Sequence, residues 1–458
     1  MNCNSKRIIL VSILSLISYI TFSQAFFDKF QKGLKDGNNI LRESNKIVRG
    51  VGQLSNSVTR ATREFNKTVR VVKGNDDEKI GRMPREQLTQ LKIKNGKVKN
   101  LDWEPYITAD NQLFPSSIIT LSGYRGATTP ELESIIRPIG FEFKSKNSNI
   151  PIKWEIECVD KRFFDKISGN CLYDIYNEKM LRNPEIPWNI EALAKQNSST
   201  PINIIFRIFD ENNNKVEKTV SAYMRSVDDC IRYYNETPLL FLYTAYIQEE
   251  HPEIRKIMKE ATDTKIVSSI EGYHGNVDKQ IAAVWRVLHD RGINYGTITT
   301  TSGGNDKSNI ISQVVRTFDK SINDRQANCV DGTIVLASIL RKMGIHSALM
   351  IVRGHCFLKY YRKQDDNEGN RSDPVYLETT ILDSENFINS AKDKARLQKN
   401  KKKSLEIINQ GYIKQFQNAQ AMGLVEYQNY GSKKEIYDII DVDLERQHVT
   451  KPIPFYSN

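Results

Sequence analysis

Apolar and polar residues alternate, or apolar residues gather in short runs, across residues 86–235. The runs include SSIITLSGY, FEFKSK, IPIKWEIECV and INIIFRIFD, and turn-forming residues separate them. Alternation with a period of two is typical of strands that bury one face, and the stretch from Asp210 to Asn214 between two such runs is a hairpin signal. The pattern predicts a β-sandwich of immunoglobulin-like type over this region.

The pattern changes after residue 235. The stretch from Pro238 to Ala261 predicts a helical lead-in with an interruption at Pro252. Residues 330–343 contain no proline, carry apolar residues on all sides and precede Gly344, which predicts a buried helix. The strand-like runs HSALMIVRGHCFLKYY and PVYLETTI follow. We therefore expect an α+β fold, with the sandwich domain followed by an α+β domain over 236–458.

Reactive side chains occur where these predicted elements begin or end. Cys329 precedes the buried helix, where the positive end of the helix dipole favours thiolate over thiol. His355 follows a strand-like run, and Glu378 ends another. Asp331, in the first helical turn, is expected to stabilise the helix, and the alternative is that its charge opposes formation of the thiolate. The order Cys329, His355, Glu378 is typical of a site in which a thiolate attacks, an imidazole carries the proton and a carboxylate orients the imidazole.

Strand geometry separates His355 from its neighbour Cys356. Successive side chains on a strand point to opposite faces, so a Cys329 that meets His355 leaves Cys356 on the wrong side. Cys356 is then expected to be a small core residue. Asp373 and Asp383 are rival carboxylates, but Asp373 precedes a proline in a predicted turn and Asp383 lies beyond the strand.

Four polar residues upstream of Cys329 are candidates for contact with a substrate. Gln326 and Asn328 come just before the cysteine, and either amide could donate a hydrogen bond to an oxyanion. Gln313 and Arg316 could bind substrate, and the alternative for them is a pair on an exposed helix surface. A single cysteine on an apolar helix, or a single strand histidine, is more often structural than catalytic, so the combination carries the hypothesis.

These residues resemble the transglutaminase-like core of the papain-like cysteine hydrolases. The segments NCVDGTIVLASILRKMGI, GHCF and LETT, with VWRVLHDRGINY and QVVR before them, are similar to those of bacterial proteins of uncharacterised function. The resemblance spans residues from about 240 to the C-terminus and aligns Cys329, His355 and Glu378 with the family's triad. Glu378 stands where the family more often has aspartate.

The resemblance implies thiol-mediated acyl transfer on amide or peptide bonds of a protein, peptide or cell-wall peptide. Water as acceptor gives a peptidase or amidase, which we favour, and an amine acceptor gives a crosslinking enzyme. No metal or organic cofactor is implied. The alternative is an envelope-associated binding or scaffold protein that keeps the fold and has no activity.

The first residues have the pattern of a secretion signal. A basic start, the apolar run IILVSILSLISYITF and the small residues near Ala25 predict a signal peptide over 1–24. Residues 25–85 are basic and predict a partly helical tether. We expect a secreted or periplasmic protein with no other transmembrane segment, and the alternative is anchoring in the inner membrane by an uncleaved first segment.

The formal net charge of +11 is concentrated in two segments, 29–73 and 392–403. Neither segment interleaves aromatic residues as a base-stacking surface does, and secretion also argues against a nucleic-acid partner. Solvated surface is the simpler interpretation. The sharper one is attraction to an anionic envelope surface.

Cysteine usage supports a free thiol. Five cysteines remain after the predicted signal, and an odd number in a secreted protein leaves at least one unpaired: Cys158, Cys171, Cys230, Cys329 and Cys356. A bridge between Cys158 and Cys171 is possible if they lie on neighbouring strands, with Cys230 as a competitor. No spacing typical of a zinc site is present.

Overall fold

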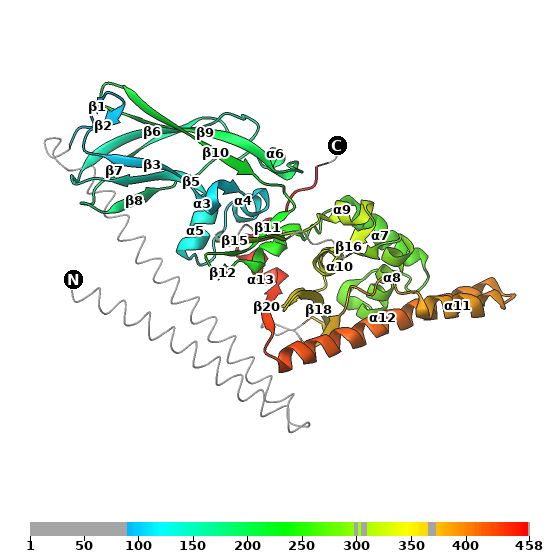
Figure 1. The fold of residues 1–458 in the computed structure, drawn as a ribbon. Coiled ribbons are helices and arrows are strands. Elements are labelled where there is room, and N and C mark those ends of the chain that lie inside the picture. The colour runs from blue at the N-terminus through cyan, green and yellow to red at the C-terminus, as the bar shows by residue number, and fades with distance from the viewer. Residues whose placement is uncertain (1–88, 297–300, 304–308, 365–371, 457–458) are drawn as a thin grey trace. The chain divides into compact units, whose positions relative to one another are not determined.

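The computed structural model describes residues 89–296, 301–303, 309–364 and 372–456. The predicted signal peptide and tether lie outside these residues. Residues 85–458 form one compact unit. The unit combines helices with several sheets, one of them curled into a half-barrel, which confirms the α+β class (Figure 1).

The first part of this unit is rich in strands. A five-stranded sheet has the order β4-β10-β9-β6-β7, and a three-stranded sheet has the order β3-β5-β8. The strands of the larger sheet are β4 (Gln112–Leu113), β6 (Ile150–Cys158), β7 (Ile167–Tyr173), β9 (Thr200–Phe209) and β10 (Lys215–Met224). Those of the smaller sheet are β3 (Asp102–Ile107), β5 (Ile139–Lys144) and β8 (Lys179–Arg182).

The predicted hairpin is present between β9 and β10. The Asp210 carboxylate accepts hydrogen bonds from the backbone N–H groups of Asn212 and Asn214, which fixes the turn. The two sheets meet through aromatic rings, because Phe141 of the smaller sheet contacts Trp154 and Phe206 of the larger one at centroid distances of 5.8 and 5.5 Å. The remaining elements of this part are short: β1 (Ile93–Lys94), β2 (Lys97–Val98), α3 (Thr108–Asn111), α4 (Pro115–Leu121), α5 (Pro130–Ile136) and α6 (Ile190–Ala194).

A four-stranded sheet spans the expected domain boundary. Strand β11 (Asp229–Tyr234) precedes residue 235, yet it pairs with β15 (Ile310–Val314), which comes much later in the chain. The order is β12-β11-β15-β14, with β12 at Thr237–Pro238 and β14 at Thr301–Gly303. The boundary near 235 stays a prediction, and β11 belongs to a sheet shared by the residues on either side of it.

Helices dominate the next part. Residues 240–246 form the 3₁₀ helix η2 (Leu240–Tyr246), and Pro252 takes the first position of α7 (Pro252–Asp263), where a proline costs no hydrogen bond. The segment that ends at residue 296 holds η3 (Gly272–His274), α8 (Val277–Asp290) and β13 (Asn294–Tyr295). After β15 come α9 (Phe318–Asn323), β16 (Gln326–Ala327), which pairs with β13 in parallel, and α10 (Cys329–Lys342).

The last sheet packs against helices α10 and α12. Its order is β19-β18-β17-β20, with strands β17 (Ser347–Val352), β18 (His355–Lys363), β19 (Ser372–Leu377) and β20 (Ile436–Asp441). Alternate residues of β18 join different apolar clusters: Cys356 and Leu358 belong to the main core with α10, while Phe357 packs in a second cluster beside Tyr427 of α12 (Lys401–Ser432). Helices α11 (Asn386–Arg396) and α13 (Val442–Gln447) complete the fold.

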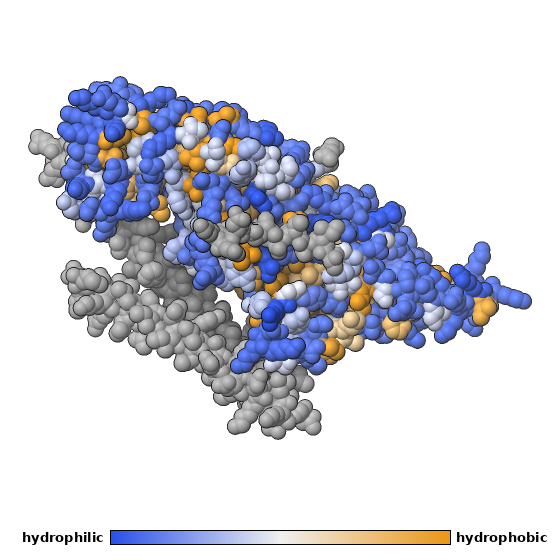
Figure 2. Space-filling view, viewed as in Figure 1, coloured by the Kyte–Doolittle hydropathy of each residue, from blue (hydrophilic) through white to orange (hydrophobic). Residues whose placement is uncertain are grey.

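The predicted buried helix is confirmed, because most residues of α10 are buried. Among the described helices none is both long and apolar enough to span a bilayer. The face in Figure 2 is mostly hydrophilic, with apolar residues in small groups.

Candidate active site

Helix α10 begins with a reciprocal cap. Asn328 is the N-cap, and its Oδ1 accepts hydrogen bonds from the backbone N–H groups of Val330 and Asp331, both at 2.9 Å. In return, the Asp331 carboxylate accepts the N–H of Asn328 at 3.1 Å. The N–H of Gly332 donates to the Asn328 carbonyl. This capping box leaves the N–H of Cys329 without an acceptor among the described residues, so it is available to a ligand.

Asp331 is fully buried and is held by Arg316. Its carboxylate accepts the Arg316 backbone N–H at 2.9 Å and the guanidinium at 2.8 Å. Burial raises the pKa of Asp331, and the hydrogen bonds from Arg316 and Asn328 oppose that rise. Arg316 also donates to Gln326 Oε1 at 3.1 Å. Asp331 therefore stabilises the helix start, as expected from the sequence, and Arg316 fixes it there.

His355 and Glu378 form a direct pair. The imidazole Nε2 lies 2.7 Å from Glu378 Oε2, and the Glu378 side chain is only 3% exposed. The other carboxylate oxygen accepts the Thr380 backbone N–H at 2.9 Å and the Thr380 hydroxyl at 2.6 Å. Although burial raises the pKa of Glu378, the hydrogen bonds and charge of His355 lower it more, so the carboxylate is ionised at neutral pH.

Helix α12 supports Glu378 from behind. The Glu378 N–H donates to the Ala419 carbonyl of this helix at 3.0 Å. One turn further, Gly423 touches the backbone of β19: a Cβ at that position would lie 2.5 Å from Tyr376 C and 2.6 Å from Leu377 N. Real side chains never come this close, so the helix can approach Glu378 only because residue 423 is glycine.

Cys329 is the second group that interacts with the imidazole. Burial lowers the pKa of His355, but the hydrogen bonds to Cys329 and Glu378, together with their charges, raise it to about 10. Since Nε2 is taken by Glu378, Nδ1 is the ring nitrogen that remains for the sulfur. Cys329 is partly exposed. Cys356, the residue after His355 on β18, is buried in the main core, as expected for the opposite face of the strand.

The rival carboxylates bind elsewhere. Asp373 pairs with Arg362 at 3.2 Å, and Asp383 accepts the Tyr295 N–H at 3.1 Å. Neither contacts His355. The structure therefore brings together Cys329, His355 and Glu378, the three residues that the sequence singled out.

The upstream candidates have different positions. The interpretation of Gln313 and Arg316 as an exposed helix pair is wrong, because Gln313 lies in strand β15, is buried, and accepts a hydrogen bond from Tyr243 at 2.9 Å. Arg316 is engaged with Asp331. Asn328 Nδ2 is buried and has no partner among the described residues, so it remains a candidate donor.

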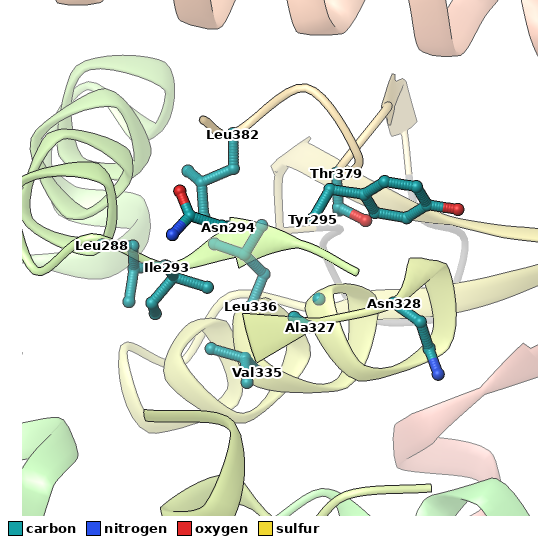
Figure 3. Close-up of a pocket in the computed structure, with 11 residues that line it drawn as sticks. Leu288, Ile293, Asn294, Tyr295, Ala327, Asn328, Val335, Leu336, Thr379 and Leu382 are labelled. Carbon is teal, nitrogen blue, oxygen red and sulfur yellow. The ribbon is translucent and has the colours of Figure 1, made fainter. Parts of the chain in front are cut away.

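A small apolar pocket adjoins the site (Figure 3). Its volume is about 10 Å³, which is room for one water molecule or a methyl group. Tyr295 and Thr379 lie at one side, while the Asn328 amide nitrogen points away from them. The other lining residues are Leu288, Ile293, Asn294, Ala327, Gly332, Val335, Leu336 and Leu382.

Sequence reasoning missed Thr380, Tyr243 and Tyr295. Burial raises the pKa of Tyr295, and the charges of Cys329 and Glu378 add to the rise, which puts this tyrosine near both. A signal for Thr380 existed, because it follows Glu378 at the distance of a local side-chain turn. Tertiary contacts place Tyr243 and Tyr295 near the candidate site, and no local sequence pattern predicts these contacts.

The five described cysteines are all free thiols, so the possible bridge between Cys158 and Cys171 is absent. Cys171 faces Ile152 in the register of β6 and β7 rather than Cys158. In the described ranges, no cluster of His, Cys, Asp and Glu has the arrangement of a metal site. The sequence matches no model of a known protein family and no curated protein. What the transglutaminase-like resemblance implies is therefore a proposal.

Proposed function

We propose that this protein is a secreted transglutaminase-like cysteine hydrolase or acyltransferase that acts on amide or peptide bonds. The observation that carries the proposal is the continuous contact from Cys329 through His355 to Glu378, with the cysteine at a helix start. In this proposal the first domain is an immunoglobulin-like sandwich and the second is the transglutaminase-like catalytic domain.

The high pKa of His355, about 10, favours an imidazolium beside Cys329 at neutral pH. The thiolate attacks the carbonyl carbon of the substrate and forms a C–S bond. The free N–H of Cys329 and the Asn328 amide are the candidate donors to the oxyanion. When the C–N bond breaks, His355 gives its proton to the leaving amine, and a thioester remains on Cys329.

Water then resolves the thioester, with His355 as the base, in a peptidase or amidase. A primary amine in place of water gives a crosslinking product. We favour hydrolysis, because Cys329 is partly exposed and excluding water demands a closed amine channel. The basic segment at 392–403 is consistent with attraction to an anionic envelope surface.

The test is a survey of peptides and cell-wall peptide fragments with wild-type protein, with and without a fluorescent primary amine. Cys329→Ala is the active-site variant, and Cys356→Ala is the matched control, since Cys356 is the buried cysteine next to His355. We expect turnover by the wild type and the control and none by Cys329→Ala. Turnover that survives in Cys329→Ala overturns the proposal. No turnover, combined with a Cys329 that reacts no faster than an ordinary thiol, leaves the scaffold alternative.

A further inference from the structure

Arg232 sits at an irregular point of strand β11. Ile231 pairs with Ser312 of β15, and Tyr233 pairs with the preceding residue, Ile311, so Arg232 is the extra residue of a β-bulge. A bulge turns a side chain out of the regular alternation, and bulges are common beside active sites for that reason.

The guanidinium of Arg232 has no anionic partner in the described part of the chain. Its Nε is buried and lacks a hydrogen bond there, and its one recorded side-chain contact is the Tyr233 ring, 5.9 Å away. Other partly buried arginines of the protein behave differently: Arg207, Arg316 and Arg341 each bind a carboxylate. A partly buried cation without a partner costs stability, and such groups are expected to have a ligand.

The pairing of β11 with β15 connects Arg232 to the candidate active site. Cys230, two residues before Arg232, faces Gln313 across the sheet, and Gln313 accepts the hydrogen bond from Tyr243. Burial raises the pKa of Tyr243, the charge of Arg232 opposes the rise, and the charge of Cys329 adds to it. Strand β15 also leads to the candidate active site, because Arg316, three residues after Gln313, donates its backbone N–H to Asp331 in the first turn of the helix that begins at Cys329.

The same relation holds at Cys356. Burial raises the pKa of this thiol, Cys329 raises it further, and Arg232 opposes the rise. The charges of Arg232 and Cys329 thus act in opposite directions on the same two buried groups, Tyr243 of η2 and Cys356 of β18.

We propose that Arg232 binds a carboxylate of the substrate beside Cys329, so that the site prefers acyl groups that carry a negative charge. This inference rests on the proposed function. A guanidinium binds a carboxylate through two parallel hydrogen bonds, which gives direction as well as charge. The carboxylate comes either from the C-terminus of a peptide or from an acidic side chain.

The test compares two alkylating reagents that differ in charge. Iodoacetate and iodoacetamide both form a C–S bond with the thiolate and release iodide, but only iodoacetate carries a carboxylate. We expect the iodoacetate-to-iodoacetamide rate ratio at Cys329, measured by peptide mass spectrometry, to be about five-fold higher in the wild type than in Arg232→Gln. Added salt lowers the ratio in the wild type, and Arg232→Lys keeps part of the preference.

Arg207→Gln is the matched control, because Arg207 already binds Glu157 and Glu217 on β9 and β10. We expect this variant to keep the wild-type ratio and to melt at a lower temperature, while Arg232→Gln melts no lower than the wild type. An equal ratio in the wild type and Arg232→Gln overturns the anion site. Slow reaction of wild-type Cys329 with both reagents contradicts the proposed function instead.

Three capped peptides distinguish the sources of the carboxylate. Acetyl-Ala-Ala with a free C-terminus, its C-terminal amide, and acetyl-Glu amide are each tested for protection of Cys329 against iodoacetamide. Protection by the first alone assigns a C-terminal carboxylate, and protection by the third alone assigns an acidic side chain. Equal protection by all three, or by none at concentrations where iodoacetate shows its preference, overturns substrate binding through Arg232.

Discussion

Two histidine–carboxylate pairs lie at opposite ends of strand β17, and only one of them adjoins a cysteine. His346 precedes the strand and binds Asp443 of α13 through Nδ1. His355 follows the strand and binds Glu378 through Nε2. In sequence the two histidines look alike, and each lies beside a strand-like run.

Their surroundings differ. The His346 and Asp443 side chains are 30% and 22% exposed and line an open polar pocket of about 360 Å³ with Arg341 and Glu249. Glu378 is 3% exposed, and its second oxygen is held by Thr380. A histidine–carboxylate pair by itself therefore does not identify an active site. Burial of the acid, and a thiol at the free ring nitrogen, make the second pair a candidate for chemistry.

The sharpest way to break this comparison is to remove each histidine. We expect His355→Ala to slow alkylation of Cys329 by iodoacetamide at pH 6 by about 50-fold, since an ordinary thiol with a pKa near 8.5 is almost wholly protonated there. His346→Ala is the matched control and should change the rate by less than about two-fold. Equal slowing by both variants would contradict a special role for His355.

The pH dependence of stability should also depend on His355. Its pKa is about 10 in the folded protein against 6.5 for the free side chain. The stabilisation of the charged form is complete below pH 6.5 and is lost as the pH rises through 10. One pKa unit corresponds to about 1.4 kcal/mol, so even half of this shift is on the order of 2 kcal/mol.

Urea unfolding of the wild type and His355→Gln at pH 6, 8 and 10 measures this effect. The difference in the free energy of unfolding between the two proteins should shrink across that range. A difference that stays constant means that His355 does not titrate as the geometry requires.

Replacing each acid by its amide tests the other half of the pairs. Glu378→Gln keeps the shape but removes the charge that holds the imidazolium, and we expect alkylation of Cys329 at pH 6 to fall about ten-fold. Asp443→Asn should leave that rate within about two-fold and lower the melting temperature, because Arg341 loses one of its two carboxylate partners and keeps only Glu249. A Glu378→Gln protein with the wild-type rate would make this glutamate a structural residue.

The smallest expected effect concerns the group that orients Glu378. Thr380→Val removes the hydroxyl hydrogen bond but keeps the backbone one. A bond of this kind contributes about 1 kcal/mol, so we expect the alkylation rate of Cys329 to fall about three- to five-fold. Thr379→Val is the control, because the neighbouring hydroxyl does not bind Glu378. Identical rates for the two variants would show that Thr380 does not orient the acid.

Local pattern was enough to place the candidate residues on their helix and strands. Residues 330–343 are rich in apolar residues and contain no proline, and the structure has a buried helix from Cys329 to Lys342. Strand alternation alone separated His355 from Cys356. The expected hairpin at Asp210–Asn214 forms because the turn residues supply their own hydrogen bonds.

Contacts between segments that are distant in the chain could not be predicted from the sequence. Gln313 looked like part of an exposed helix, but pairing with β11, far earlier in the chain, makes its segment a strand. The support of Glu378 by Ala419 and the isolation of Arg232 at its bulge depend on tertiary packing. The basic stretch at 392–403 gave no indication that α12 extends to Ser432, because the helix is held by β19 and α8 rather than by its own periodicity.

The close approach at Gly423 has a consequence for natural variation. Every glycine codon becomes an alanine codon by one base change at its second position. At this position that change places a methyl group inside the backbone of β19 and forces α12 away from Glu378. Random mutagenesis should therefore recover proteins altered at residue 423 in which Cys329 is alkylated slowly, although this residue never touches the thiol, the imidazole or the carboxylate.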